Sequence, residues 1–200
     1  MITSRIKERY RKFRKSRISQ GDLLRDVKFV LKGGLFGENK NEIALKYAVV
    51  MSQECDIDLD FKARQNKKNN DKYLPTILVC PAYQAQEFFN GTHIKGWVMT
   101  PKTGGEPDKI KKNDQLSRYH YLEGNDDLSV PELVIDFKHF FTIPRSLMYR
   151  YRKTGYIATV NELFREELAQ RFSFYLSRFA LPEIKAPASR IAVVNSTATN

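Results

Sequence analysis

Two short segments carry side chains that could move protons or attack a substrate. In the first, residues 118–121 (Arg-Tyr-His-Tyr) alternate, and alternation along a strand places Arg118 and His120 on one face. Arg118 could then bind a phosphate while His120 acts as general acid or base in transesterification of a ribose 2′-hydroxyl. A strand with one solvent-facing side explains the same pattern equally well.

The second segment, residues 52–56 (Ser-Gln-Glu-Cys-Asp), directly follows an apolar run and is expected at the end of a strand. Cys55 could act as a nucleophile if His120 or His93 reached its thiol, with Asp56 beside it. The interpretation that we favour is structural: Cys55 packs as a small apolar side chain, and the neighbouring polar residues form a turn.

The remaining histidines, His93 and His139, stand alone in the sequence and are expected to be structural. The sequence has no His/Asp/Glu spacing typical of a metal site, no glycine-rich phosphate loop and no Gly-x-Ser-x-Gly nucleophile. We therefore predict neither a metal nor a cofactor.

The formal net charge of +11 is concentrated in two segments, residues 1–20 and 62–72, which together account for all of it. Such basic patches attract polyanions, although solvated faces that only aid solubility have the same composition. We predict nucleic acid as the partner. The side chains expected to contact it are Arg5, Arg9, Arg11, Lys12, Arg14, Lys15, Arg17, Lys62, Arg64, Lys67 and Lys68.

The elements that would position these groups are short strands separated by Gly, Asn, Asp and Pro. Six runs have strand character: residues 26–31, 44–51, 76–80, 94–99, 118–122 and 132–137. They predict a mainly β protein of the α+β class, with an antiparallel sheet curled into a small SH3-like barrel over residues 20–182. Residues 61–72 and 102–113 are expected to be surface loops, residues 1–19 a basic N-terminal helix or arm, and residues 183–200 a disordered tail.

One amphipathic helix is predicted after the sheet. Thr159 and Glu162 form a capping-box pair, and an apolar stripe follows as far as Phe179. The stripe comprises Val160, Leu163, Phe164, Leu168, Phe172, Tyr175, Leu176 and Phe179. Because it is wider than one small barrel needs, we expect it to contact the barrel, a second copy of the chain, or both.

Four segments, taken in chain order, resemble the PemK/MazF-like family of toxins. Residues 20–24 (Gln-Gly-Asp-Leu-Leu) resemble the opening Gly-Asp strand, and residues 46–52 resemble the family's Arg-Pro-apolar-Ser strand. Residues 74–83 are similar to the next strand. Residues 133–137 and 141–147 resemble the last strand and its turn into a helix.

This resemblance implies a small dimeric SH3-like barrel that cleaves RNA without a metal. Lys46 stands where the family has a catalytic arginine, and Tyr83 where it has a catalytic threonine. Lysine is a flexible point charge rather than a planar fork, and tyrosine carries its hydroxyl further out, so both exchanges alter the chemistry. The implied function is a toxin-type endoribonuclease with Lys46, Tyr83, Arg118 and His120 near the scissile phosphate.

The resemblance also implies partners: RNA in preference to DNA, and a second copy of the chain or an antitoxin-type protein. Two alternatives stay open, namely a non-catalytic barrel that docks on nucleic acid or a larger complex, and a cysteine-centred enzyme built on Cys55 and Asp56. The sequence has no apolar run of the roughly 18 residues that a membrane span needs, and only two cysteines. We expect a cytoplasmic protein without a membrane partner.

Overall fold

The computed structural model describes residues 8–12, 16–33, 39–67, 70–113 and 115–178, with side chains described outside 31–41. Its strands are β1 (Tyr10–Arg11), β2 (Asp22–Gly33), β3 (Asn39–Val50), β4 (Thr76–Gln84), β5 (Tyr119–Leu122), β6 (Leu133–Asp136), β7 (Phe141–Pro144) and β8 (Tyr156–Val160). Its helices are α1 (Glu54–Asn66), the 3-10 turn η1 (Asn70–Lys72), α2 (Ala85–Phe89), α3 (Glu106–Lys111), α4 (Arg145–Gly155) and α5 (Glu162–Leu176).

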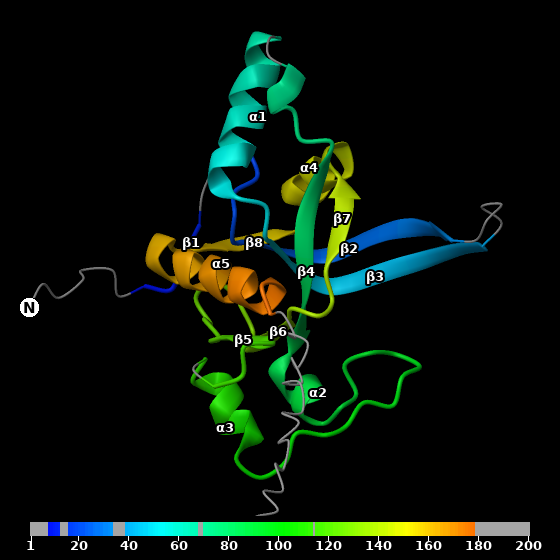
Figure 1. Ribbon diagram of the computed structural model, residues 1–200, viewed down its shortest axis with the longest axis vertical. Coiled ribbons are helices and arrows are strands. Elements are labelled where there is room, and N and C mark those ends of the chain that lie inside the picture. Colours follow the sequence, from blue (N-terminus) through cyan, green and yellow to red (C-terminus); the bar gives the residue numbers. More distant parts are fainter. Residues whose placement is uncertain (1–7, 13–15, 34–38, 68–69, 114, 179–200) are drawn as a thin grey trace, which may run out of the picture.

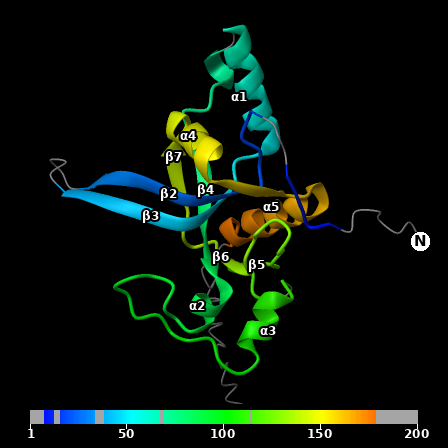
Figure 2. The ribbon, with the colours of Figure 1, turned by 180° about the vertical axis from the view of Figure 1, so that it is seen from behind.

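These strands form one antiparallel sheet in the order β1-β8-β2-β3-β4-β6-β5, and β7 pairs with β4. The predicted α+β class and antiparallel pairing are confirmed. The predicted curling of this sheet into a small barrel is wrong, because β1 and β5 lie at opposite ends of the strand order and do not pair. The β2–β3 hairpin pairs along nearly its full length, but β2 meets β8 only over Asp22–Leu24. Its outer half therefore projects from the body of the molecule, as Figures 1 and 2 show.

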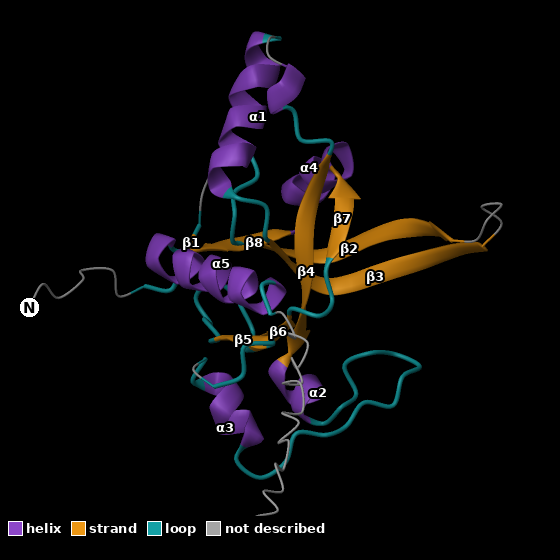
Figure 3. Cartoon of the chain, in the orientation of Figure 1, coloured by secondary structure: helices purple, strands orange, loops and turns teal. Residues whose placement is uncertain are grey.

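Alternation along the central strands sends neighbouring side chains into two separate cores. Leu23 and Val49 pack with Ile135, Phe137 and the α5 residues Leu168 and Phe172. Leu24 and Val50, one position further along, pack instead with Ile57 of α1 and Met148 of α4. The sheet thus carries helices against both cores, and their placement in Figure 3 follows from this alternation.

The C-terminal helix begins later than predicted. Its N-cap is Asn161, whose Oδ1 accepts a hydrogen bond from the Glu162 N–H at 3.0 Å. Thr159 lies in β8, and its hydroxyl donates to the buried Asp22 carboxylate at 2.6 Å, so the capping-box prediction is wrong. Leu168 and Phe172 are buried, Leu163 and Leu176 are exposed, and Phe179 lies outside the described residues. Phe164 and Tyr175 pack partly buried against the same core, so the chain itself covers part of the predicted stripe.

Three other expectations differ from the structure. Residues 61–72 are mostly helical, because the buried Asp60 accepts hydrogen bonds from the Leu74 N–H and from Arg64 and ties α1 to the chain that follows. Residues 94–99 form a loop rather than a strand, and Trp97 is 66% exposed there. Residues 102–113 include α3.

The basic N-terminal segment is predicted to be a helix or an arm. Its described part contains β1, which pairs with β8, rather than a helix. The predicted tail at residues 183–200 lies outside the described residues. Among the helices described, none has the length and apolar character needed to cross a bilayer.

Candidate functional site

The predicted catalytic residues do not come together. His120 is 1% exposed and packs beside Phe137, and burial together with nearby Arg171 lowers its pKa to about 3. Arg118 directly precedes β5 and its side chain is partly exposed, whereas His120 lies within the strand and is buried. A neutral imidazole sealed in the core has no route to a substrate, and the prediction that His120 is a general acid or base is wrong.

Lys46 and Tyr83 lie on neighbouring strands, β3 and β4. Lys46 is exposed, and its Nζ bonds to the Gln84 side chain and lies 3.3 Å from a Glu87 carboxylate oxygen. Tyr83 instead lies in a groove together with the two histidines that the sequence left as structural.

That groove is built from three separate segments. Tyr83 comes from the end of β4, His93 from the loop after α2, and His139 from the turn between β6 and β7. The Tyr83 hydroxyl lies 3.0 Å from His139 Nδ1, and the Tyr83 and His93 rings lie 4.6 Å apart between centroids. Their wide separation along the sequence explains why no spacing motif reveals them.

Burial decides the protonation of these groups. It lowers the pKa of His93 and of His139 below the ordinary histidine value, and the nearby Asp136 carboxylate opposes it in both cases. Burial raises the pKa of Tyr83, so its hydroxyl keeps the proton. Both imidazoles are therefore neutral at pH 7, as a general base must be.

Neither ring nitrogen of His93 receives a hydrogen bond of normal geometry from the described residues. The Glu87 carbonyl lies close enough to raise the pKa of this imidazole, but its bonds go to Thr92. Both nitrogens are themselves buried, so His93 holds hydrogen-bonding capacity that no described residue uses. Such unsatisfied buried nitrogens are uncommon in folded proteins and mark candidate sites.

A buried ion pair stands behind His139. Arg118 donates two hydrogen bonds to Asp136, at 2.8 Å from Nε and 2.6 Å from Nη2. Asp136 is 1% exposed, and its Oδ2 lies 3.8 Å from His139 Nδ1. Arg118, predicted to hold a substrate phosphate, instead holds this carboxylate.

The groove has a cavity volume of about 530 Å³ with mostly apolar walls. Its lining includes Glu42, Ile43, Ala44 and Leu45 of β3, Ile94, Lys95 and Trp97 of the loop, and Phe141 of β7. Gly91 closes the loop that carries Trp97: its φ is +73°, and a Cβ there would lie 2.3 Å from the Met99 carbonyl oxygen. An apolar cavity with a few converging polar groups is the usual form of a ligand site.

No protein-family model matches this chain, and no curated protein does. The site must be judged on its own chemistry. Within the described ranges, no group of three or more His, Cys, Asp and Glu side chains is placed to hold a metal ion.

A second cavity, of about 640 Å³, lies at the start of α1. Cys55 is exposed at its rim, with Sγ 3.6 Å from Gln53 Oε1 and 3.8 Å from Asp56 Oδ1. The other lining residues are Arg17, Gln20, Glu54, Asp58, Glu166 and Ala169. The lining residues that the structure describes include no histidine, so the predicted pairing of Cys55 with His120 or His93 is not found.

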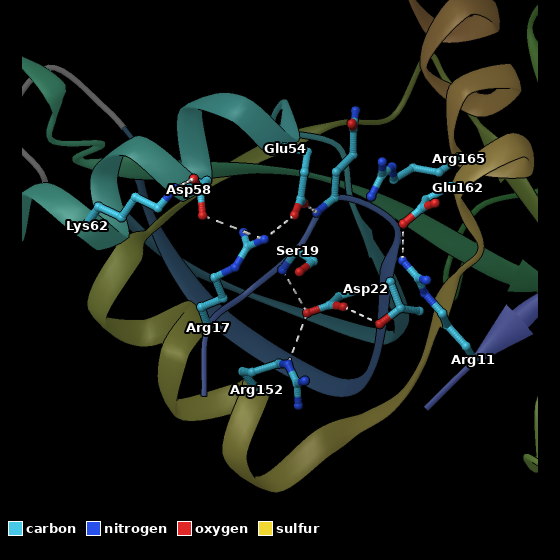
Figure 4. A network of polar contacts seen from close by, with 12 residues as sticks. Arg11, Arg17, Ser19, Asp22, Glu54, Asp58, Lys62, Arg152, Glu162 and Arg165 are labelled. Carbon is cyan, nitrogen blue, oxygen red and sulfur yellow. Dashed lines mark hydrogen bonds and ion pairs between the residues drawn. The ribbon is translucent and has the colours of Figure 1, made fainter. Parts of the chain in front are cut away.

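Polar contacts fill the surroundings of this second cavity (Figure 4). Arg17 lies 2.5 Å from Glu54, whose other oxygen accepts the Gln20 N–H at 2.8 Å. Deeper in, Asp22 accepts hydrogen bonds from the Ser19 N–H, from Arg152 Nε and from Thr159. These bonds hold the turn before β2 against α4 and β8, which is a structural task.

Several of the basic side chains predicted to bind nucleic acid are occupied by acidic neighbours in the same chain. The ion pairs are Arg9–Glu123, Arg11–Glu162, Arg17–Glu54, Lys62–Asp58 and Arg64–Asp60. Lys12 and Lys67 are exposed, whereas Arg5, Arg14, Lys15 and Lys68 lie outside the described residues. The described part of the two basic segments is therefore less available to phosphates than the net charge indicates.

Proposed function

We propose that the protein binds RNA in the Tyr83–His93–His139 groove and cleaves it without a metal. The observation that carries this proposal is the meeting of two neutral imidazoles and a tyrosine hydroxyl in one mostly apolar groove. Imidazoles with pKa values shifted by their surroundings are typical of acid–base catalysis.

The reaction that suits these groups is transesterification. His139 takes the proton of a ribose 2′-hydroxyl, the 2′-oxygen forms a bond to phosphorus, and the bond from phosphorus to the 5′-oxygen breaks. His93, protonated, gives its proton to that leaving oxygen. The bound phosphate supplies the negative charge that raises the pKa of His93 and favours its charged form. The products are a 2′,3′-cyclic phosphate and a 5′-hydroxyl.

Recognition of the strand falls to groups at the rim. Trp97 is 66% exposed beside the histidines, and an exposed indole offers a stacking surface to an unpaired base. Lys95 on the same loop is exposed, and Lys46 is 58% exposed on β3. Both side chains are exposed and suit contacts with backbone phosphates, although Lys46 must leave its ion pair with Glu87 to make one.

The resemblance to PemK/MazF-like toxins supports the same proposal. Residues 22–24, 46–50 and 76–83 lie in β2, β3 and β4, and residues 141–144 lead as β7 directly into α4. The segments that resemble the family's strands are therefore strands here. The catalytic positions differ: Tyr83 is retained in the proposal, Lys46 becomes a phosphate contact, and the histidines come from elsewhere.

The test is cleavage of a mixed-sequence RNA by the full chain in excess EDTA. We expect fragments that end in 2′,3′-cyclic phosphate, and no cleavage of a DNA of the same sequence, which lacks the 2′-hydroxyl. Binding without cleavage would leave the non-catalytic module as the function. Neither binding nor cleavage would overturn the proposal.

Cys55 supports a second candidate function, cysteine-centred chemistry. The specific observation is its exposed thiol in the first turn of α1, at the rim of the 640 Å³ cavity, whereas Cys80 is buried. An activity abolished both by iodoacetamide and by Cys55→Ser, with RNA left intact, would favour this candidate.

A further inference from the structure

The turn between β6 and β7 is built around Asp136. Its backbone carbonyl accepts the His139 N–H at 2.9 Å, and its Oδ1 accepts the Lys138 N–H at 3.0 Å. Arg118 donates to both carboxylate oxygens in the two-pronged arrangement that arginine forms with carboxylates. The carboxylate is thus fixed in place at one side of the His139 ring.

His139 Nδ1 faces two oxygens. One is the Tyr83 hydroxyl at 3.0 Å and the other is Asp136 Oδ2 at 3.8 Å. A neutral imidazole carries one proton, either on Nδ1 or on Nε2. A carboxylate beside Nδ1 stabilises the tautomer whose N–H points toward the negative charge, and this leaves Nε2 with a free electron pair.

We propose that Asp136, clamped by Arg118, is a positioning residue that keeps the His139 proton on Nδ1 and makes Nε2 the proton acceptor. The inference rests on the proposed function of the groove, because it assigns the atom that takes the proton from the 2′-hydroxyl. It is also a statement about the ring itself, and can be measured without any activity.

The charged and titratable groups that face His139 come from four segments. Asp136 and Lys138 belong to its own turn, Tyr83 to β4, His93 to the loop after α2, and Arg118 to the segment before β5. Burial is the main cause that lowers the pKa of His139. Asp136 raises this pKa, and Arg118 and Lys138 lower it.

These signs give opposite expectations for the two members of the clamp. Asp136→Asn removes the negative charge, so the pKa of His139 falls further. Arg118→Gln removes the positive charge and leaves the carboxylate, so the pKa of His139 rises. Because the loss of either charge shifts this pKa by electrostatics alone, the tautomer of His139 is the measurement that separates a positioning role from a structural one.

The experiment is an NMR titration of the imidazole signals in the full chain, which has only three histidines. We expect ¹⁵N shifts of the Nδ1–H tautomer for His139 in the wild type, and a mixture of tautomers in Asp136→Asn. The pKa of His139 should fall in Asp136→Asn and rise in Arg118→Gln. His120 serves as an internal reference, because its pKa responds to Arg171 and Arg9 rather than to Asp136.

Two control variants keep the test decisive. Glu132→Gln removes an exposed carboxylate just before β6 and should leave His139 unchanged. Lys138→Gln changes an exposed side chain of the same turn and should raise the pKa of His139, which gives a result even if the clamp variants fail to fold. An Nε2–H tautomer in the wild type, or an unchanged tautomer in folded Asp136→Asn, would overturn the inference.

Cleavage assays separate this inference from the proposed function. If RNA is cleaved, Asp136→Asn should reduce kcat/KM by about tenfold to a hundredfold, and the acidic limb of its pH profile should move to lower pH. The pH profile of Arg118→Lys should lie between those of Arg118→Gln and the wild type, because lysine keeps the positive charge but cannot make the two-pronged contact. If RNA is not cleaved but the titration gives the expected tautomer, the positioning role stands and the proposed function fails.

Discussion

The cavity at the start of α1 and the Tyr83–His93–His139 groove both hold polar side chains but use them differently. At the start of α1, Arg17 and Glu54 meet as a partly buried ion pair, and the hydrogen bonds of Glu54 connect the segment before β2 to α1. In the groove below the β2–β3 hairpin, Tyr83, His93 and His139 stand among apolar walls and carry no charge at pH 7. Charges that satisfy one another stabilise the fold, whereas neutral proton carriers in an apolar groove remain available to a ligand.

The largest expected effect separates the cavities by activity. His139→Asn keeps a polar side chain of similar size but removes the proton acceptor, so the cleavage rate should fall by about 10²–10⁴-fold. Cys55→Ser, the matched change at the other cavity, should stay within about twofold of the wild type, since general acid–base catalysis in the groove does not use its thiol. Initial rates on one RNA measure both. Equal losses of cleavage rate in the two variants would show that the groove has no special role in the reaction.

The second expected effect separates the cavities by stability. Arg152 Nε donates to Asp22, which is 1% exposed, so Arg152→Met leaves a buried carboxylate short of a partner and should cost about 3–5 kcal/mol. Tyr83→Phe removes a single hydrogen bond in the groove and should cost only about 0.5–1.5 kcal/mol. Urea unfolding of both variants is the measurement.

The pH dependence of this second effect follows from Asp22. Burial raises its pKa to about 6, above the ordinary value of 3.8. The folded protein therefore binds an extra proton between these two pH values, and the contribution of this group to stability falls as pH rises through that range. The Arg152→Met defect should be largest above pH 6 and smaller at pH 4. An unfolding free energy that is independent of pH would contradict this account.

The sequence predicted the local elements better than the site. Alternation in residues 26–31 correctly indicated β2, because alternation reports a strand with one buried face, and the apolar run in residues 132–137 indicated β6, which is buried throughout. Alternation also misplaced Arg118 and His120, because four alternating residues do not show where a strand starts or whether both of its faces are buried. Closure of a barrel depends on pairing between strands that lie far apart in the sequence. The local hydrophobic pattern does not show which strands pair.

His93 and His139 show why the groove was missed. Each is isolated in the sequence, and three segments far apart along the chain bring them to Tyr83. One local signal was present: His139 follows Asp136 by three residues, a spacing that a tight turn converts into proximity. The ion pairs of Arg9 and Arg11 could not be predicted either, because their partners Glu123 and Glu162 lie more than a hundred residues away in the sequence.

The third prediction concerns binding in the groove. Trp97→Ala should weaken RNA binding by about 1–3 kcal/mol, the usual contribution of one stacked base, and should leave the fold intact because the indole is 66% exposed. Val98→Ala, at the fully exposed neighbour, is the control and should bind as the wild type does. Fluorescence anisotropy of a labelled RNA measures both. Unchanged affinity in Trp97→Ala would place the base elsewhere.

The smallest expected effect concerns salt. Lys95→Gln should reduce the slope of log affinity against log salt by about 0.7, the value for one phosphate contact on a single strand. Arg11→Gln should change the slope less, because Arg11 lies 2.7 Å from Glu162 and is already neutralised. Titrations at several salt concentrations compare the two. A larger change in Arg11→Gln would indicate that the N-terminal segment, rather than the groove, supplies the phosphate contacts.

The most direct test of the central claim is to locate RNA on the protein. Amide and side-chain chemical shifts are followed while a short RNA with 2′-O-methyl riboses, which lacks the attacking hydroxyl, is added to the full chain. We predict that Tyr83, His93, Trp97 and His139 shift together, with the indole N–H of the single tryptophan as the clearest signal. Shifts confined to Gln20, Glu54 and Cys55, with the groove unaffected, would contradict the account.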